Sequence, residues 1–140
     1  MIFIDTWGFI AFINKREPKH GEVVNLLNDE WNKKESIYTS DYVLDETISF
    51  ISRNLDYDKV DQFLETIDKA LQNDSLKIFW IKEDEFNEAI RKRKKYKDKL
   101  DISFTDLTTA VLMEKYHINK IITQDKHFQF LNNDFEFLFQ

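Results

Sequence analysis

Four acidic residues indicate the chemistry open to this chain: Asp5, Glu46, Asp106 and Asp125. Asp5 directly follows the apolar run Ile2-Phe3-Ile4, and Asp125 comes soon after the run Lys120-Ile121-Ile122-Thr123. Because a charge is costly inside a buried strand, both carboxylates are expected where their strands end. Carboxylates held close together repel one another unless a cation lies between them, and Mg²⁺ prefers oxygen ligands. Such a group of acids, if the fold gathers it, predicts a magnesium site.

The elements that would position these acids alternate between strands and helices. Apolar runs predict strands over residues 2–5, 36–39, 76–81 and 119–123, and an edge strand over 135–139. Helical spacing of apolar residues and capping signals predict the intervening helices, over residues 6–13, around 23–31, 40–55, around 60–71, 83–96 and 103–116. Strands separated by helices predict an α/β fold in three layers, with a mostly parallel sheet of four to five strands and helices on both faces.

Ligands of open α/β sheets collect outside the carboxyl ends of the strands. Asp5 and Asp125 are expected at that edge, and Asp106 lies in the first turn of a helix that starts there. Glu46, in the second turn of its helix, is long enough to reach inward. The sequence therefore predicts that the four carboxylates meet in one place.

Each carboxylate also has an ordinary structural explanation. Ser103-Phe104-Thr105-Asp106 fits a capping box, in which Asp106 only satisfies a backbone donor. Asp125 fits the N-cap of a short helix, and Glu46 fits a solvent-facing helix position. Asp5 is the hardest to explain in this way, because strand chemistry does not require an acid directly after an apolar run.

Composition narrows the class of protein. A length of 140 residues corresponds to a single domain, residues 1–140, and no apolar stretch approaches the roughly 20 residues of a membrane span. The chain has no cysteine and no basic leader before its apolar start, so a cytoplasmic protein without disulfides is expected. The net charge of −6 is unusual for a nucleic-acid-binding protein, but basic residues concentrate between Arg91 and Lys99. This stretch is either a solvated helix face or a contact strip for RNA or an acidic partner.

Other catalytic chemistries have little support in the sequence. His20, His117 and His127 are too widely spaced for a zinc site of the paired-histidine kind, and His127 is interpreted as a surface or capping residue. No glycine-flanked serine or phosphate-binding glycine loop is present. A phosphotransfer enzyme with Asp5 as its nucleophile would require a second acid two places later, where the chain has Trp7.

Five sequence blocks, in order, resemble the PIN-domain proteins, and most of all the VapC-like toxins of toxin–antitoxin pairs. They span most of the chain and include Tyr-Val-Leu-Asp-Glu-Thr and Ser-Phe-Thr-Asp, which are fairly specific in combination. The blocks are residues 3–14, 16–20, 39–47, 101–106 and 123–128.

The resemblance implies a Mg²⁺- or Mn²⁺-dependent ribonuclease that cuts single-stranded or loop RNA. Asp5, Glu46, Asp106 and Asp125 match the acidic quartet of the family, which would bind the metal and carry out catalysis. The resemblance also implies supporting roles for Thr6, Thr123 and Asp101, whereas Trp7 departs from the small polar residue common at its position.

A toxin of this kind implies a cognate antitoxin and a homodimer, with an apolar face near Trp7, Phe9 and Phe12 as a candidate docking surface. Two alternatives stay open: a housekeeping RNA-processing nuclease, and a PIN-fold module that binds RNA or protein without cutting.

Overall fold

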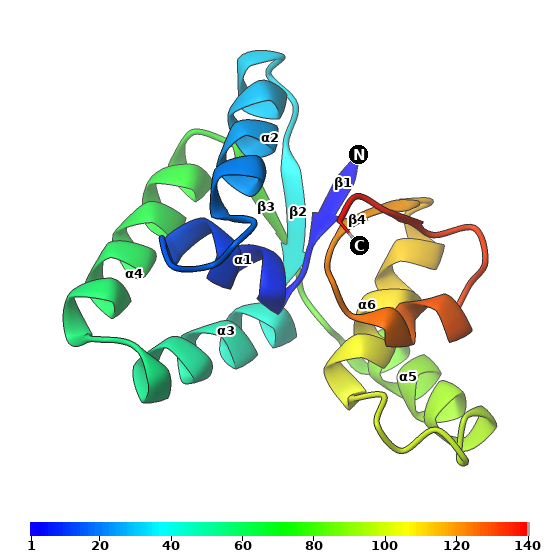
Figure 1. Cartoon of the computed structure of the whole chain (residues 1–140). Coiled ribbons are helices and arrows are strands. Elements are labelled where there is room, and N and C mark those ends of the chain that lie inside the picture. The colour runs from blue at the N-terminus through cyan, green and yellow to red at the C-terminus, as the bar shows by residue number, and fades with distance from the viewer. Residues whose placement is uncertain (140) are drawn as a thin grey trace.

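The computed structural model, which describes residues 1–139, is built on a five-stranded sheet in the order β3-β2-β1-β4-β5 (Figure 1). All four strand pairs are parallel. The strands are β1 (Ile2–Ile4), β2 (Ile37–Ser40), β3 (Leu76–Phe79), β4 (Lys120–Ile122) and β5 (Glu136–Phe137). The predicted number of strands and the parallel sheet are therefore confirmed, with β5 at the edge.

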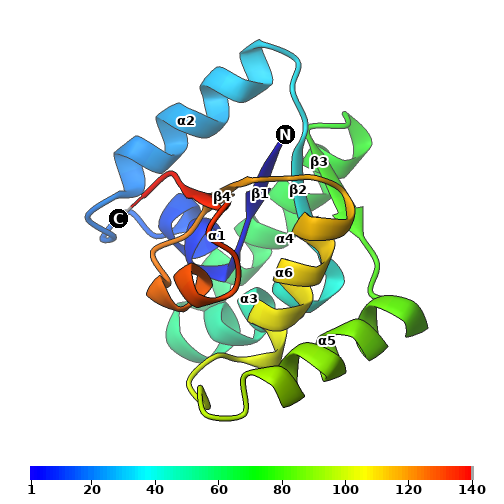
Figure 2. The same cartoon turned by 90° about the vertical axis from the view of Figure 1, so that its right-hand side faces the viewer.

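Six α-helices and one short 3₁₀ helix connect the strands. They are α1 (Thr6–Ile13), α2 (His20–Asn32), α3 (Asp41–Asn54), α4 (Tyr57–Gln72), α5 (Glu83–Lys95), α6 (Phe104–Lys115) and η1 (Lys126–Phe130). Figures 1 and 2 show α1, α2 and α4 on one side of the sheet and α6, backed by α5, on the other. The three-layer architecture predicted from the sequence is thus confirmed.

Helices cover both faces of the sheet because the direction in which strands are added across the sheet reverses after β3. The first three strands are added outward in the order β1, β2, β3, whereas β4 returns to the other side of β1. A right-handed connection in each direction places the two sets of helices on opposite faces. The reversal leaves β1 and β4 as neighbours with their carboxyl ends side by side, and ligands of open sheets bind at such a point.

Four strands are shorter than predicted from their apolar runs, and two of them by little: β1 ends at Ile4 rather than Asp5, and β4 covers residues 120–122 rather than 119–123. β3 ends at Phe79 rather than Ile81, because the backbone N–H of Ile81 donates to the Asp41 side chain at 3.0 Å instead of to a neighbouring strand. β5 keeps only Glu136 and Phe137 of the predicted strand 135–139. Phe135 and Phe139 are nevertheless buried, so the apolar residues of this segment pack into the core without extending the sheet.

Helix α6 is buried on almost every side. All seven residues from Leu107 to Met113 are buried, including the polar Thr108 and Thr109. α6 lies between the sheet and α5, so packing on these two sides fixes its position (Figure 2). The first turn of α6, which carries Asp106, is held accordingly.

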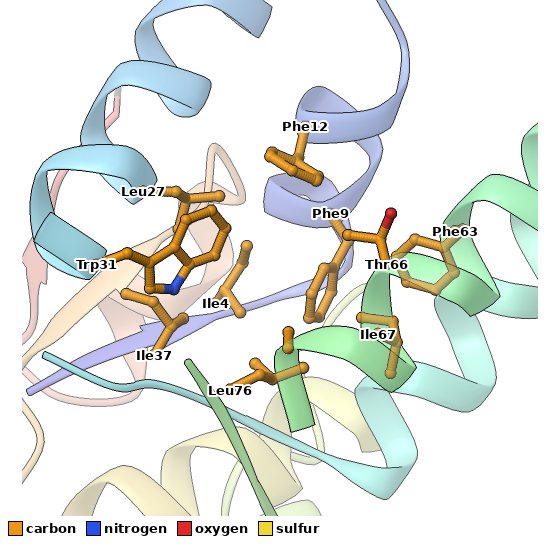
Figure 3. A pocket seen from close by; sticks show the side chains of 11 residues that line it. Ile4, Phe9, Phe12, Leu27, Trp31, Ile37, Phe63, Thr66, Ile67 and Leu76 are labelled. Atoms are coloured by element: carbon orange, nitrogen blue, oxygen red, sulfur yellow. The ribbon is translucent and has the colours of Figure 1, made fainter. Parts of the chain in front are cut away.

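An apolar cavity of about 30 Å³ lies between the sheet and helices α1, α2 and α4 (Figure 3). Phe9 and Phe12 line it from α1, where Phe9 packs edge-on against Phe63 at 5.5 Å and Phe12 against Trp31 at 6.1 Å between ring centroids. The expectation that Phe9 forms part of an exposed docking face is wrong. The aromatic side of α1 is used within the chain, where α2 and α4 cover it.

Helices long and apolar enough to cross a membrane do not occur in the part of the chain that the structure describes.

Candidate active site

The carboxyl ends of β1 and β4 bring two of the predicted site segments into contact. Ile4 pairs with Ile122 in the parallel register, so the residues that follow, Asp5 and Thr123, are neighbours. The hydroxyl of Thr123 donates to Asp5 Oδ2 and accepts the backbone N–H of Asp125 at 2.9 Å. A single threonine therefore links the acids that follow the two strands.

Asp5 also starts helix α1. It is the N-cap, and its Oδ1 accepts the backbone N–H of Gly8 at 3.2 Å. The absence of a side chain at Gly8 permits this arrangement, since a Cβ there would lie 2.6 Å from Ile4 Cγ1 and 3.0 Å from the carbonyl oxygen of Ile122. Close approach of α1 to β1 and β4 fixes the carboxylate of Asp5, which is only 7% exposed.

The structural roles considered for Asp106 and Asp125 are both present. Asp106 completes a capping box with Ser103, in which the Asp106 backbone N–H donates to Ser103 Oγ at 3.0 Å and the Ser103 N–H donates to Asp106 Oδ2 at 3.3 Å. Asp125 caps η1 by accepting the His127 N–H at 2.9 Å. Capping orients each carboxylate and leaves it further lone pairs, so these roles do not compete with a ligand role.

All four predicted acids line one hollow of about 380 Å³, between α1, α3, the start of α6 and the segment after β4. Glu46 reaches it from the second turn of α3. The residues that line the hollow are Asp5, Thr6, Trp7, Ile10, Glu17, Val43, Glu46, Phe50, Thr105, Asp106, Thr109 and Asp125. We refer to it as the acidic pocket. Within residues 1–139 no lysine or arginine lines it, so neither kind of side chain balances its carboxylates from within the pocket.

The acidic pocket perturbs two of its acids. The pKa of Asp5 is raised to about 7, chiefly by burial and also by the charges of Asp106 and Asp125, against the hydrogen bonds from Thr123 and Gly8. The pKa of Asp106 is likewise raised to about 7, chiefly by burial, with added repulsion from Asp125 and Glu46. Both groups therefore tend to hold a proton near neutral pH unless a cation compensates their charge.

His127 joins the site in a way that the sequence analysis missed. One ligand atom each from Asp106, Asp125 and His127 lie within 4.8 Å of one another, a separation that a single metal ion could bridge. His127 Nδ1 lies 2.9 Å from Asp125 Oδ1. The sequence signal that could have identified His127 is its position two residues after Asp125. The 3₁₀ turn of η1 brings side chains at that spacing close together. The earlier interpretation as a capping residue is incomplete, since the side chain faces the acids.

Two further residues of the acidic pocket were missed. Glu17, in the loop after α1, adds a fifth carboxylate. Thr109 lies one turn after Asp106 on α6, is 1% exposed, and has a hydroxyl without a hydrogen-bond partner among the described residues. Thr6 was predicted as a supporting residue. Its hydroxyl is also buried and has no hydrogen-bond partner among the described residues. A spacing of three residues from Asp106 was the available signal for Thr109.

Two features of the predicted site do not join the acids. Asp101 is exposed in the turn before α6 and is not among the residues that line the acidic pocket. Trp7 lines the pocket and packs against Phe139, with ring centroids 5.6 Å apart. Trp7, two places after Asp5, thus forms an apolar wall of the pocket.

Comparison with protein families decides the family. The model of the PIN domain matches residues 2–133, which is most of the chain. The chain belongs to the PIN-domain family. Among curated proteins none matches the chain.

Two solved structures support the fold of this PIN domain. One is VapC20 of Mycobacterium tuberculosis, described as a toxin that cleaves the sarcin-ricin loop. It has 21% identity and a TM-score of 0.74, and the match covers 92% of this chain and 93% of that chain. The other is VapBC2 from Rickettsia felis, bound to a DNA fragment from its promoter. It has 17% identity and a TM-score of 0.66, and the match covers 98% of this chain and 97% of that chain.

Proposed function

We propose that this PIN domain is a metal-dependent endoribonuclease that hydrolyses phosphodiester bonds in single-stranded or loop RNA, and that it is the toxin of a toxin–antitoxin pair. The observation that carries the proposal is the acidic pocket, to which four separate segments each contribute one acid of the predicted quartet. Family membership supports the same reading. The proposal includes a cytoplasmic location, where such RNA substrates occur.

The residues present fit a hard dication, Mg²⁺ or Mn²⁺. The donors are carboxylate oxygens, without the thiolates or paired histidines that softer metals prefer. The pKa values of Asp5 and Asp106 are raised to about 7, chiefly by burial and also by repulsion from neighbouring acids, so both carboxyl groups resist ionisation unless a cation balances them. Asp5, Glu46, Asp106 and Asp125 would hold the ion. When bound, it would neutralise the phosphate and lower the pKa of a bound water.

The chain's own residues have separate tasks in the proposed reaction. Asp5 is held by Thr123 and Gly8, so its two oxygens are fixed at the base of the pocket. Asp106 and Asp125, when ionised, can accept a hydrogen bond from the attacking water and orient it for in-line attack on phosphorus. The unpartnered hydroxyls of Thr6 and Thr109 are available to donate to phosphate oxygens. We assign no contact with the reaction to Asp101.

Two alternatives are weaker, and a third shares the proposed chemistry. A phosphotransfer enzyme would need a polar group at Trp7, whose ring instead packs on Phe139. A non-cleaving PIN module has no need for a pocket lined by five carboxylates, in which burial, with added repulsion between the acids, raises the pKa values of Asp5 and Asp106. A housekeeping nuclease would use the same chemistry and differs only in its biological target.

The test is cleavage of mixed cellular RNA by the purified protein, with and without Mg²⁺, beside Asp5→Asn. Asp101→Asn is the matched control, because it removes an exposed carboxylate outside the pocket. We expect Mg²⁺-dependent cutting by the wild type and the control, and none by Asp5→Asn. Equal cutting by all three proteins, or cutting that persists in chelator, would rule out the mechanism.

The proposal includes a cognate antitoxin and a homodimer. The acidic pocket is a fitting receptor for a basic side chain of an antitoxin, because its carboxylates have no cationic partner among the lining residues. Co-expression with the antitoxin should relieve growth arrest by the wild type, and sedimentation should give twice the mass of the chain. Growth arrest by Asp5→Asn as strong as that by the wild type would contradict the toxin assignment.

A further inference from the structure

The basic stretch at the end of α5 has a location that the proposed chemistry does not explain. Seven of the nine residues from Arg91 to Lys99 are lysine or arginine, in a chain whose net charge is −6. Some of these charges follow from helix stability, since cations are favourable in the last turn of a helix. Helix stability does not account for those beyond Lys95, where α5 ends.

Three of the seven basic side chains have structural partners. Arg93 donates to the carbonyl oxygens of Tyr96, Lys99 and Ile102, and so braces the loop from residue 96 to residue 102. Lys92 pairs with Glu114 on α6 at 2.9 Å, and Arg91 Nε donates to Glu88 at 2.8 Å. Only the contacts of Arg93 brace the loop; the pair of Lys92 joins α5 to α6, and that of Arg91 lies within α5.

Two of the four remaining cations, Lys95 and Lys99, lie beside aromatic rings. Lys94, Lys95 and Lys97 are exposed and form no ion pair within residues 1–139. Lys99 Nζ lies 4.4 Å from the ring centroid of Phe130, at the end of η1, and that ring is 54% exposed. Positive charges interleaved with exposed aromatic rings are the composition of a surface that binds single-stranded nucleic acid.

The same surface adjoins, along the chain, two of the segments that supply acids to the acidic pocket. The braced loop runs directly into Ser103 and Asp106 at the start of α6, and η1 follows directly after Asp125. In Figures 1 and 2 the loop after α5 lies below η1, at the end of α6 where that helix begins. The Lys99–Phe130 contact therefore joins the two segments that carry Asp106 and Asp125.

We propose that Lys94, Lys95, Lys97 and Lys99, with Phe130, form an RNA-binding strip that feeds a single strand into the acidic pocket. The lysines contact phosphates on one side of the cleavage point, and Phe130 stacks on a base. The strip offsets the repulsion between RNA and the pocket, because its positive charge lies outside the carboxylates. This inference rests on the proposed function for what happens in the pocket, but binding can be measured without cleavage.

RNA fits this strip better than an acidic protein does. Lys94 and Lys95 lie in the last turn of α5, Lys97 and Lys99 lie on the braced loop, and Phe130 presents an exposed ring to a base. An acidic protein segment would use the lysines but would gain little from base-stacking geometry. The two occupants therefore differ in their dependence on Phe130.

The experiment measures binding of a fluorescent single-stranded RNA of about 12 nucleotides by Asp5→Asn protein with Mg²⁺, over a range of salt concentrations. The strip variant adds Lys94→Gln, Lys95→Gln and Lys97→Gln. The control variant adds Lys34→Gln, Lys69→Gln and Lys77→Gln, which remove the same charge from exposed residues beside other hollows. A third variant adds Phe130→Ala, and an RNA with abasic positions is its companion probe.

We expect the strip variant to bind about tenfold or more weakly, with a salt slope lower by about 2, since each phosphate contact on a single strand contributes about 0.7. The control should bind like the parent. Phe130→Ala should weaken binding by about fivefold or more, and the abasic RNA should abolish that difference. Equal losses in strip and control variants, or an unchanged salt slope in the strip variant, would overturn the inference. Loss of RNA binding with the lysine changes but none with Phe130→Ala would show phosphate contact without stacking on Phe130 and would also overturn the inference.

Failure of the proposed function gives a different result. In that case wild-type protein would cut no RNA with Mg²⁺, while the strip variant would still lose affinity relative to its control. Conversely, cleavage by the wild type together with undiminished RNA binding by the strip variant would refute the strip and leave the nuclease standing.

Discussion

Without metal, Asp5→Asn should gain stability relative to the wild type as pH rises, although the same change removes activity. Asp5 is buried and its pKa is raised from 3.8 to about 7. A group whose pKa is higher in the folded state binds its proton more tightly there, so its contribution is fully favourable below about pH 4. That contribution is lost as pH rises from about 4 to about 7. The uncharged amide of the variant has no such dependence.

The magnitude follows from the size of the shift. One pKa unit corresponds to about 1.4 kcal/mol, so a shift of about 3 units costs the wild type about 4 kcal/mol at pH 8. About 2 kcal/mol of this cost develops between pH 5.5 and pH 7, a range in which denaturation is readily measured. The amide cannot accept both hydrogen bonds that Asp5 receives from Gly8 and Thr123, which adds an offset independent of pH. The slope with pH is therefore the diagnostic quantity.

The assay is chemical denaturation of wild type, Asp5→Asn and Asp101→Asn in chelator at pH 5.5 and 8. The difference in free energy of unfolding between Asp5→Asn and the wild type should shift by about 2 kcal/mol in favour of Asp5→Asn from pH 5.5 to pH 8. This shift is equivalent to about 5–8 °C in Tm. Asp101→Asn should follow the wild type, because its carboxylate is exposed. Added Mg²⁺ should stabilise the wild type and leave Asp5→Asn nearly unchanged. A difference between wild type and Asp5→Asn that stays flat with pH would refute the reasoning.

Three further predictions concern the same pocket. Mg²⁺ affinity of the wild type should fall as pH drops through about 7, because Asp5 and Asp106 must each release a proton; calorimetry in buffers of different ionisation enthalpy should detect this release, and its absence would contradict the raised pKa values. Thr109→Val should lower cleavage about tenfold yet raise the free energy of unfolding by about 1 kcal/mol, because the lost hydroxyl is buried without a partner among the described residues. Its control is Thr108→Val, which should lower the free energy of unfolding by about 1 kcal/mol, because that hydroxyl donates to the carbonyl oxygen of Thr105 at 2.7 Å. Gly8→Ala should lower stability by about 1–3 kcal/mol in denaturation and impair cleavage, because overlap with Ile4 and Ile122 outweighs the gain in helix propensity of about 1 kcal/mol; a stabilised variant would disprove the close approach of α1.

The strongest local signals in the sequence led to correct elements. The helix predicted over 6–13 matches α1, and the capping signals at Ser40 and Ser103 start α3 and α6 as expected. Such signals are local because a cap and its first turn lie within four residues. Strand ends were less accurate, since a strand stops where its partners stop. Ile81 continues an apolar run, yet its N–H bonds to Asp41 on another element.

The candidate site was predictable only where an acid followed a structural signal. Asp5 and Asp125 could be placed by the runs before them, and Asp106 by its capping box. Glu17 gave no such signal, because it is in a loop whose path depends on α1 and α2. The apolar face expected around Phe9 failed for a related reason, since periodicity shows that a side is apolar but not that α4 covers it.

The sequence by itself determined the family, the order of strands and helices and the identity of the four acids, because these depend on residue type and short-range spacing. Tertiary structure alone decided that Asp5 is bound to Thr123, that His127 faces Asp106, and that Lys99 lies on Phe130. In each case the partners come from different segments of the chain. The packing of those segments, and no local pattern, sets the distance between them.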